Sequence, residues 1–342
     1  MMIVDTESVC FDREKRGKRM AIKWGVLGTA GIASWGTIPG MQQAEGCELY
    51  AIAGRSETKV NEFKERFGFQ KAYVGYDALL ADDEVRAVYI PLPNHLHYEW
   101  VMKAIEAGKH VLCEKPLALN AVEAEEMFRA AKRKGVHFAE AYAYLHSPYV
   151  ASLREVIDSG SIGEVDYIET AFITQGYEED YRLHKEFGGG AMYDLGCYCT
   201  TMMLSLVDAE PTFVKACAEF GGDDVDFNTA GIVKFENGVR ASFNVGMIFG
   251  KGANGRFDRL FVHGSKGWIR SEVEYNQAGE LSYRVMTNGK EEIKTVTARQ
   301  NYCLEVEQMN RAIEGTGTLL VTPEFSLRNA KLMDAVLREI EY

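Results

Sequence analysis

The chain has 342 residues, carries a net charge of −12 at pH 7, and is 46% hydrophobic and 26% charged by residue count. These values are ordinary for a globular protein, and the length is sufficient for two domains. No basic cluster occurs beyond the first 23 residues, so nucleic acid is not expected as a partner. No apolar run reaches the roughly 18 residues that a membrane-spanning helix needs, so no membrane association is expected.

The seven cysteines are scattered and odd in number. This pattern argues against a disulfide framework and favours a reducing, cytoplasmic environment. Cys197 and Cys199 form a C-x-C pair, but no second pair with zinc-like spacing accompanies them, so we expect core cysteines and no metal. Residues 1–20 lack a long apolar core and are not a signal peptide. They are expected to be an N-terminal extension, either a disordered tail or a segment upstream of a second start at Met20.

Residues 21–142 alternate between short apolar strands and amphipathic helices. Such alternation predicts right-handed βαβ crossovers and a parallel sheet, as in a Rossmann domain. The expected strands are 21–27, 47–54, 85–92, 110–114 and 136–142. The expected helices are 56–68, 95–108 and 121–135, with a further helix-like stretch that Pro39 and Gly40 interrupt.

Residues 143–342 follow a different pattern and are assigned to a second domain for substrate binding and oligomerisation. From 212 to 300 the chain consists of long expected strands and tight turns, and Asn237-Gly238 is a strong signal for a type I′ hairpin. Helices are expected at 149–160, 191–207 and 323–340. We predict an α+β domain with an open, predominantly antiparallel sheet that helices cover on one face. The last helix is expected to pack back near the Rossmann domain.

The first expected strand leads into the turn GVLGTAGIAS, where a literal G-x-G-x-x-G motif is absent. Small residues let a backbone approach a pyrophosphate closely, and the following helix N-terminus favours its negative charge. The expected cofactor contacts in this turn are Gly28, Ala30, Gly31 and Ile32.

The second expected strand ends in Ala53-Gly54-Arg55-Ser56, without the acid that NAD-preferring folds usually place there. Arg55 can pair with a phosphate and stack on adenine. We therefore expect Arg55 and Ser56 to contact the cofactor. NADP(H) is favoured, and NAD(H) is the alternative.

Four motifs then occur in order: GVLGTAGIA, IPLPNHLHYE, EKPLA and GGGAMYDLGCY. With these motifs the chain resembles the Gfo/Idh/MocA oxidoreductases over residues 21–342. The resemblance implies a Rossmann domain followed by an open sheet domain. It also implies an NAD(P)-dependent dehydrogenase or reductase acting on CH–OH groups of a carbohydrate-like substrate, assembled as a homodimer or homotetramer through the sheet.

The resemblance also implies roles for single residues. Lys115, in the E-K-P motif, corresponds to the catalytic lysine of the family. Glu114 corresponds to the acid beside the nicotinamide ribose. The segment that lines the nicotinamide corresponds to Pro91, Asn94 and His97.

Asp194 and the residue four positions later correspond to the family's D-x-x-x-H pair, but this chain has Tyr198 in place of the histidine. A tyrosine there resembles the branch that contains glucose–fructose oxidoreductase, dimeric dihydrodiol dehydrogenase and ketosugar reductases. The arginine of the frequent Y-R-x-H-P motif is also replaced, by Leu145, so the contact of that arginine with substrate is not expected.

Lys115 and Tyr198 are expected to handle the proton that accompanies hydride transfer. A phenol accepts a proton near neutral pH only if its pKa falls from about 10, and a nearby ammonium favours that change. In the reverse direction Tyr198 would donate the proton while Lys115 steadies the developing charge. Asp194 is expected to hold a sugar hydroxyl or to tune the pair, and His146 or His184 is the alternative acid or base.

Aromatic and polar residues near the predicted site fit a sugar, polyol or related cyclic substrate, since tyrosine rings stack on sugar faces. The expected substrate contacts are Tyr142, Tyr144, Tyr181 and His184. Two other functions stay open at this point. One is a dehydrogenase of trans-dihydrodiols or a reductase of non-sugar ketones, and the other is a non-catalytic regulator that senses the dinucleotide.

Overall fold

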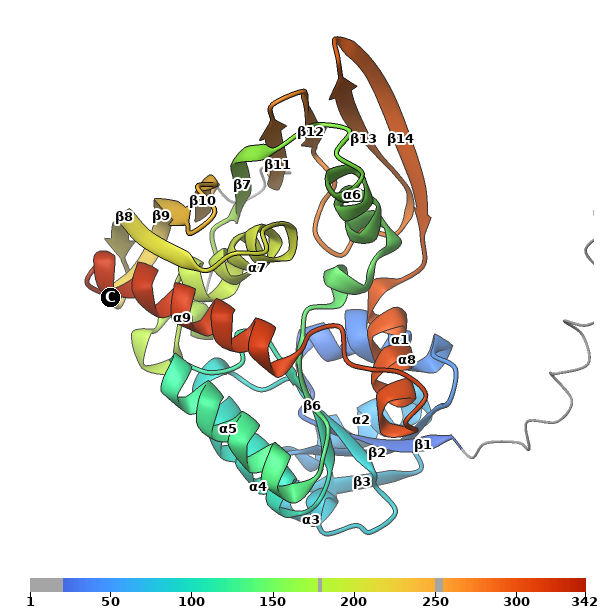
Figure 1. Ribbon diagram of the computed structural model, residues 1–342. Helices are drawn as coiled ribbons and strands as arrows, with labels where there is room; N and C mark the ends of the chain where they lie inside the picture. Colours follow the sequence, from blue (N-terminus) through green and yellow to red (C-terminus); the bar gives the residue numbers. More distant parts are fainter. Residues whose placement is uncertain (1–20, 178–179, 250–254) are drawn as a thin grey trace, which may run out of the picture.

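Two sheets, one parallel and one mostly antiparallel, form the framework of the protein (Figure 1). The computed structural model describes residues 21–177, 180–249 and 255–342. The expected extension over residues 1–20 lies outside the described residues. The predicted fold class, a Rossmann sheet followed by an open and predominantly antiparallel sheet, is confirmed.

The first sheet has six parallel strands in the order β3-β2-β1-β4-β5-β6, which is the order of dinucleotide-binding Rossmann folds. Its strands are β1 (Ile22–Leu27), β2 (Cys47–Gly54), β3 (Lys71–Val74), β4 (Ala87–Ile90), β5 (His110–Glu114) and β6 (Phe138–Ala141). The edge strand β3 is absent from the predicted strands because it is only four residues long and ends in an exposed Val74.

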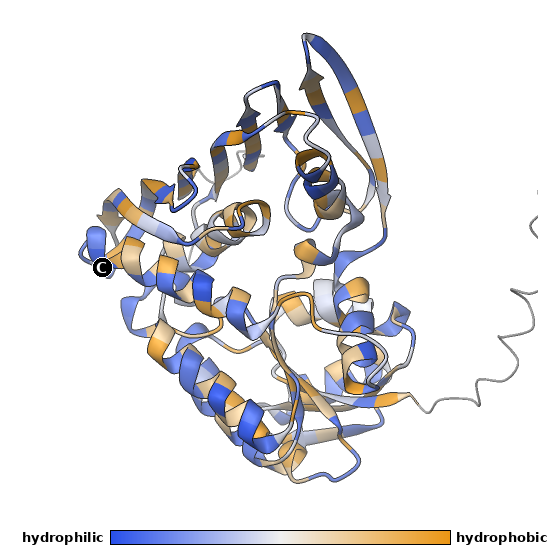
Figure 2. Cartoon of the chain, in the orientation of Figure 1, coloured by the Kyte–Doolittle hydropathy of each residue, from blue (hydrophilic) through white to orange (hydrophobic). Residues whose placement is uncertain are grey.

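Side chains alternate along these strands and build one hydrophobic cluster on each face of the sheet. The covering helices include α2 (Glu57–Phe67), α3 (Tyr76–Leu80), α4 (His97–Glu106) and α5 (Ala121–Lys134). The Ser56 hydroxyl accepts a hydrogen bond from the amide of Lys59 at the start of α2, and Gly135 ends α5 in the left-handed conformation. Figure 2 shows polar and apolar residues alternating along α5, as expected for a helix with one buried side.

The segment after the first strand is one continuous helical stretch. It contains a π-helical turn over Ala33–Thr37 and continues as α1 (Ile38–Gln43), with Pro39 in the first turn. The expected interruption at Pro39 and Gly40 is therefore wrong. Proline is tolerated in the first turn of a helix, and Gly40 marks a close helix contact, since a Cβ there would come within 2.7 Å of Tyr302.

The helix that approaches Gly40 is α8 (Asn301–Ile313), which is absent from the sequence-based expectations. It follows the second sheet in the chain but returns to the first one. The Trp24 indole on β1 donates a hydrogen bond of 2.9 Å to the side-chain oxygen of Asn310. Several α8 side chains join the core on that face of the parallel sheet, so a late part of the chain completes the first unit.

The second sheet has eight strands in the order β14-β13-β12-β11-β7-β10-β9-β8. Among the described strands of this second sheet, only β7 and β10 pair in parallel. The strands are β7 (Val165–Gln175), β8 (Pro211–Gly221), β9 (Val225–Phe235), β10 (Arg240–Phe249), β11 (Phe257–Gly264), β12 (Gly267–Ser271), β13 (Gly279–Thr287) and β14 (Lys290–Ala298).

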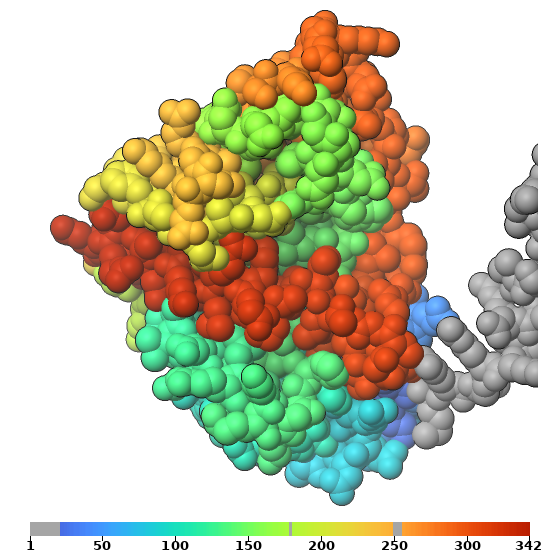
Figure 3. Space-filling view, viewed as in Figure 1, coloured from blue at the N-terminus to red at the C-terminus, as the bar shows by residue number. Residues whose placement is uncertain are grey.

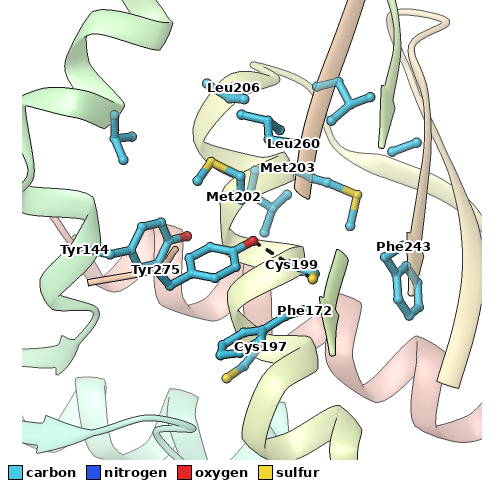
Figure 4. Packing of buried hydrophobic residues seen from close by; sticks show 14 of the residues in the cluster. Tyr144, Phe172, Cys197, Cys199, Met202, Met203, Leu206, Phe243, Leu260 and Tyr275 are labelled. Atoms are coloured by element: carbon cyan, nitrogen blue, oxygen red, sulfur yellow. Dashed lines mark hydrogen bonds between the residues drawn. The ribbon is translucent and has the colours of Figure 1, made fainter. Parts of the chain in front are cut away.

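Three helices pack against one face of this sheet: α6 (Pro148–Asp158), α7 (Cys197–Leu206) and α9 (Pro323–Glu339). Figure 4 shows Cys199 and Met203 of α7 among the aromatic and aliphatic side chains of the core. Figure 3 shows α9, in red, between the teal helices of the first unit and the yellow and green segments of the second. The amide of Ala121 donates a hydrogen bond of 3.0 Å to Asp334, which ties α9 to the start of α5.

The expected hairpin at Asn237-Gly238 joins β9 and β10 as an antiparallel pair. Its turn is not of type I′, because Gly238 has a φ of 86° while Asn237 is not among the described residues with positive φ. The amide of Gly238 donates to the carbonyl of Phe235 at 3.0 Å. This is the longer hairpin loop in which a type I turn is followed by a left-handed glycine.

Within the described ranges of the chain, no helix is both long and apolar enough to cross a membrane.

Glu305 on α8 is buried, at 2% exposure, and neither of its carboxylate oxygens has a hydrogen-bond partner among the described residues. Burial raises the pKa of this carboxyl well above its usual range, and the charge of Glu114 adds to the effect. A folded state that holds the proton more tightly than the unfolded chain loses stability as pH rises from about 4.3 toward the folded-state pKa.

We therefore expect Glu305→Gln to be more stable than the wild type by about 1–3 kcal/mol at pH 8, because it removes an unpaired buried charge. The gain should shrink as pH falls to 5. Urea unfolding at both pH values measures the difference, with the exposed Glu125→Gln as the matched control. A gain of equal size at the two pH values would contradict the raised pKa of Glu305 in the folded state.

Candidate active site

A cleft of ≈ 1130 Å³ runs past the carboxyl ends of β1, β2, β4 and β5 and under the second sheet. This is the edge at which open parallel sheets usually hold ligands. The predicted cofactor residues that line it are Gly28, Ala30, Gly31, Ile32, Arg55, Ser56, Pro91, Glu114 and Lys115. The cleft therefore brings together residues from four separate strand ends.

The cofactor end of the cleft is formed by the turn after β1. Gly28 has a φ of 133°, and a Cβ at this position would come within 3.2 Å of Leu92. A small residue is therefore required where the backbone borders the cleft. Arg55 lies at the end of β2, and Lys59 on the first turns of α2 lines the same region. This backbone cradle with two cations fits a dinucleotide that carries several phosphates.

At the centre of the cleft, the Lys115 ammonium contacts Asp194 in two ways. Its Nζ lies 2.8 Å from the Asp194 carbonyl oxygen and 3.1 Å from Oδ1 of the carboxylate. Burial would lower the pKa of Lys115, but the Asp194 charge outweighs burial and the pKa is raised well above its ordinary value. Lys115 is therefore an ammonium throughout the physiological pH range, suited to donating hydrogen bonds rather than to accepting a proton.

Asp194 is held by two further groups that lie in the segment before its helix. The Tyr177 hydroxyl donates to Oδ2 at 2.9 Å, and the Arg182 guanidinium lies 2.9 Å from Oδ1. Burial would raise the pKa of Asp194, but Lys115 and Arg182 together lower it below its usual range. The carboxylate is thus ionised and is held by three side chains, Lys115, Tyr177 and Arg182.

Arg182 is a residue that the sequence analysis missed. Its signal in the sequence is weak: one arginine in the acidic, polar run that precedes the glycine triplet. The guanidinium is also 3.1 Å from both carboxylate oxygens of Asp180, so it bridges two acids. That bridge depends on how the loop after β7 folds, which local sequence patterns do not report.

Tyr198 lies beside Lys115, as expected, with the Nζ atom 4.8 Å from the centroid of its ring. The ring packs in an aromatic cluster with Phe172 at 5.5 Å and Tyr275 at 5.1 Å between centroids. Burial raises the pKa of the Tyr198 phenol, and the Lys115 charge acts in the opposite direction without reversing the shift. The phenol is therefore protonated at neutral pH in this structure.

Two residues of the predicted nicotinamide segment do not line the cleft and instead support its wall. Asn94 is buried, and its amide donates a hydrogen bond of 2.7 Å to the carbonyl of Gly188. The two ring nitrogens of His97 each lie 2.8 Å from a carbonyl oxygen, of Pro116 and of Leu92. Burial lowers the pKa of His97 to about 4. The neutral imidazole has one N–H, so one of these contacts is a hydrogen bond at neutral pH.

Of the predicted substrate contacts, Tyr181 lines the cleft, whereas Tyr142, Tyr144 and His184 do not. Tyr142 and Tyr144 are buried behind Tyr198 and belong to the core of the second unit. Their position has a physical reason, because a tyrosine after a buried strand can turn into the core as readily as into a cleft.

The two histidines considered as alternative acids or bases also lie outside the cleft. His184 is half-exposed, and its Nδ1 lies within hydrogen-bonding distance of the Asp223 carboxylate. His146 is packed against Gln308, with 2.7 Å between Nε2 and the side-chain oxygen, and burial lowers its pKa to about 4. Neither ring is placed to exchange a proton with a ligand in the cleft.

The far end of the cleft is formed by second-sheet residues that the sequence analysis did not single out. Arg256, immediately before β11, stacks over the Phe172 ring, with its guanidinium carbon 4.5 Å from the ring centroid. The loop between β12 and β13 adds polar groups. The lining residues from this end are Phe172, Arg256, Glu274, Tyr275, Asn276 and Gln277.

Comparisons with known proteins find matches to both parts of the chain. Residues 22–142 match the oxidoreductase family with an NAD-binding Rossmann fold, GFO/IDH/MocA, and residues 150–270 match the C-terminal domain of that family. The chain is 32% identical over 329 residues to D-xylose 1-dehydrogenase (NADP(+)) 2 of Haloferax volcanii, covering 93% of this chain and 97% of that protein.

The chain is also 32% identical to the dTDP-3,4-didehydro-2,6-dideoxy-alpha-D-glucose 3-reductase of Actinomadura kijaniata, over 92% of this chain and 94% of that protein. The crystal structure of a 3-ketoreductase from the same organism, in complex with NADP and TDP-benzene, superposes with a TM-score of 0.87 at 30% identity. It covers 94% of this chain and 98% of that one.

The buried charges around Asp194 give a stability prediction. Asp194→Asn leaves Lys115 and Arg182 with less compensating charge, so it should destabilise the fold by about 3 kcal/mol at pH 7. Because the folded-state pKa of Asp194 is depressed, its contribution is present above the unfolded value of about 3.9 and is lost as pH falls below it.

The loss caused by Asp194→Asn should therefore shrink between pH 5 and pH 3.5, as measured by urea unfolding. The exposed Asp83→Asn is the control and should change the unfolding free energy by less than about 0.5 kcal/mol. If Asp194→Asn leaves the unfolding free energy unchanged at pH 7, the ion pair does not stabilise the fold.

Proposed function

The chain belongs to the GFO/IDH/MocA family of oxidoreductases, and we propose that it transfers a hydride between the nicotinamide ring of NADP(H) and a carbon of a sugar, polyol or related cyclic substrate. The reacting carbon is that of a secondary alcohol or its ketone. As a member of the family, the chain is an NAD(P)-dependent dehydrogenase or reductase that acts on CH–OH groups.

The observation that carries this proposal is the convergence of Lys115, Asp194 and Tyr198 in one cleft. The ammonium comes from the end of β5 in the first sheet, and the other two groups come from the helical segment under the second sheet. The family comparison and the position of the cleft support a substrate whose reacting carbon lies between these groups and the cofactor end.

We assign the Lys115 ammonium to the oxygen of the reacting group. It would donate a hydrogen bond to a ketone oxygen and offset the negative charge that develops there during reduction. Tyr198, which carries its proton at neutral pH, would then donate that proton to the oxygen. In the direction of alcohol oxidation the phenol has to lose its proton first, and the Lys115 charge favours that step.

NADP(H) is proposed as the preferred cofactor because two cations line the cleft beside the end of β2. Arg55 and Lys59 line the cleft beside the end of β2, and the sequence Ala53-Gly54-Arg55-Ser56 has no carboxylate that would repel a phosphate on the adenosine ribose. The NADP dependence in the name of the xylose dehydrogenase relative supports the same preference.

A homodimer or homotetramer through the second sheet is part of the proposal. The face of that sheet away from its helices contains a hollow of ≈ 700 Å³. Exposed apolar side chains lie on its strands, among them Phe213, Ile232 and Phe257. The cysteines that the structure describes are free thiols, which supports a cytoplasmic location.

The proposed chemistry predicts different outcomes for two substitutions. Lys115→Ala should abolish turnover, while Arg182 continues to compensate Asp194 and the fold survives. Tyr198→Phe keeps the ring in its aromatic cluster but should lower kcat by about 10²–10⁴. Steady-state kinetics with NADP⁺ and a panel of aldoses, inositols and trans-dihydrodiols measures both effects, and circular dichroism checks the fold.

A near-normal kcat in Tyr198→Phe would mean that water or another group, and not Tyr198, handles the proton. A wild-type protein that binds NADP⁺ but turns over no alcohol or ketone of the panel would favour the dinucleotide-sensing regulator. Higher efficiency with trans-dihydrodiols than with sugars would favour the dihydrodiol dehydrogenase.

The cofactor assignment has its own test. Arg55→Gln should lower kcat/KM for NADP⁺ by about 10–100-fold, because it removes a charged partner of the phosphate, and should change kcat/KM for NAD⁺ little. Lys64→Gln removes the same charge from α2 outside the cleft and serves as the control. Equal losses with both cofactors, or a wild-type preference for NAD⁺, would overturn the assignment.

A further inference from the structure

We infer that the substrate end of the cleft accepts an uncharged cyclic polyol, such as a free monosaccharide, and rejects sugars that carry a phosphate, nucleotide or carboxylate group. This inference rests on the proposed function and specifies its substrate class. Its basis is that each cation which lines this end in the described residues is already paired with a carboxylate of the protein.

The first such cation is Arg182. Its Nη1 lies 3.1 Å from both carboxylate oxygens of Asp180, and its Nε lies 2.9 Å from Oδ1 of Asp194. The guanidinium carbon also lies 4.7 Å from the centroid of the Tyr181 ring. Two acids and an aromatic face therefore occupy this arginine before any substrate arrives.

The second cation is Arg256. It makes a bidentate pair with Asp258, with distances of 2.8 Å and 2.7 Å, and it donates to the carbonyl of Tyr275 at 3.0 Å. A third contact, of 3.6 Å, joins it to the carboxylate of Glu274. Asp258 is buried, so this arginine is anchored in the cleft wall and is neutralised there.

The third cation, Lys115, is paired with Asp194. The three cations thus face the carboxylates of Asp180, Asp194, Asp258 and Glu274. Among the described residues of this end, an anionic group would meet no unpaired cation and a net excess of negative charge. It would have to break a partly buried ion pair, and the like charges brought together in such a site would repel each other.

The opposite end of the same cleft is different. Arg55 and Lys59 line it, and neither takes part in an ion pair with a described residue. The cleft therefore offers free positive charge at the cofactor end and paired charge at the substrate end. Phosphate is accepted at one end only.

The substrate end is nevertheless rich in groups that bind hydroxyls. Carboxylates accept hydrogen bonds from sugar O–H groups, and the amides of Asn276 and Gln277 both donate and accept. The rings of Tyr181 and Phe172 supply apolar faces for a sugar ring. An uncharged polyol uses all of these groups without disturbing the ion pairs.

Asp180 is the specificity residue that can be tested most cleanly. Asp180→Asn frees one side of Arg182, while an asparagine can still accept the hydrogen bond that Asp180 accepts from the amide of Arg182 at the start of its 3₁₀ turn. The matched control is Glu186→Gln, which removes the same charge from an exposed position on the same segment outside the cleft.

The experiment measures kcat/KM of the purified enzyme with NADP⁺ for matched pairs of neutral and anionic compounds. The pairs are D-glucose against D-glucose 6-phosphate, D-glucuronate and dTDP-glucose, and D-xylose against its phosphate. The wild type and Glu186→Gln should prefer the neutral member by about 100-fold or more. Asp180→Asn should narrow that preference by about 10-fold, mainly through a lower KM for the anionic member.

A wild type that uses nucleotide-linked or phosphorylated sugars as well as neutral ones overturns this inference and leaves the proposed function standing. An unchanged preference in Asp180→Asn overturns the role of the charge pairing. If no compound is turned over, the shift in Tm of the NADP⁺-bound protein decides. If neutral polyols alone raise the Tm, the inference about the substrate end holds while the proposed catalytic function fails. If neutral polyols leave the Tm unchanged, both the inference and the proposed function are overturned.

Discussion

The ion pair between Lys115 and Asp194 is the interaction on which the rest of the site depends. Its two members lie 79 positions apart in the chain, one at the end of a parallel strand and the other in the π-helical turn before α7. Because the pair is buried, neither charge can be left alone without a cost of several kcal/mol. The pair therefore fixes the two units against each other at the point where the chemistry is proposed, and it sets the ammonium beside the Tyr198 ring.

Two buried carboxylates show how the same fold produces opposite electrostatic results. Asp194 has three donors or cations around it and stays ionised, whereas Glu305 has no such partner among the described residues and retains its proton more readily. Burial is similar in the two cases, so the difference comes from the partners. The ionised Asp194 can orient the Lys115 ammonium. Glu305 does not line the cleft.

The sequence predicted the parts of the protein that local patterns determine. Strand β2 has the predicted bounds, and the E-K-P motif located Lys115 at a strand end in the cleft. Helix α8 escaped prediction because its packing depends on small residues such as Gly40, more than 250 positions earlier in the chain. Arg182 and Arg256 escaped because their roles depend on which acids the loops place beside them, and no spacing rule reports that.

The contacts far from the cleft set the relative position of the two units that border it. Helix α8 is joined to the parallel sheet by the hydrogen bond from Trp24 to Asn310, and α9 is joined to α5 by the one from Ala121 to Asp334. Both helices follow the second sheet in the chain and pack against elements of the first unit, so each holds the two units together. An ammonium and a phenol on different units act together only if their separation is held to within a fraction of an ångström. The long return of the chain is the physical means by which this fold holds that separation.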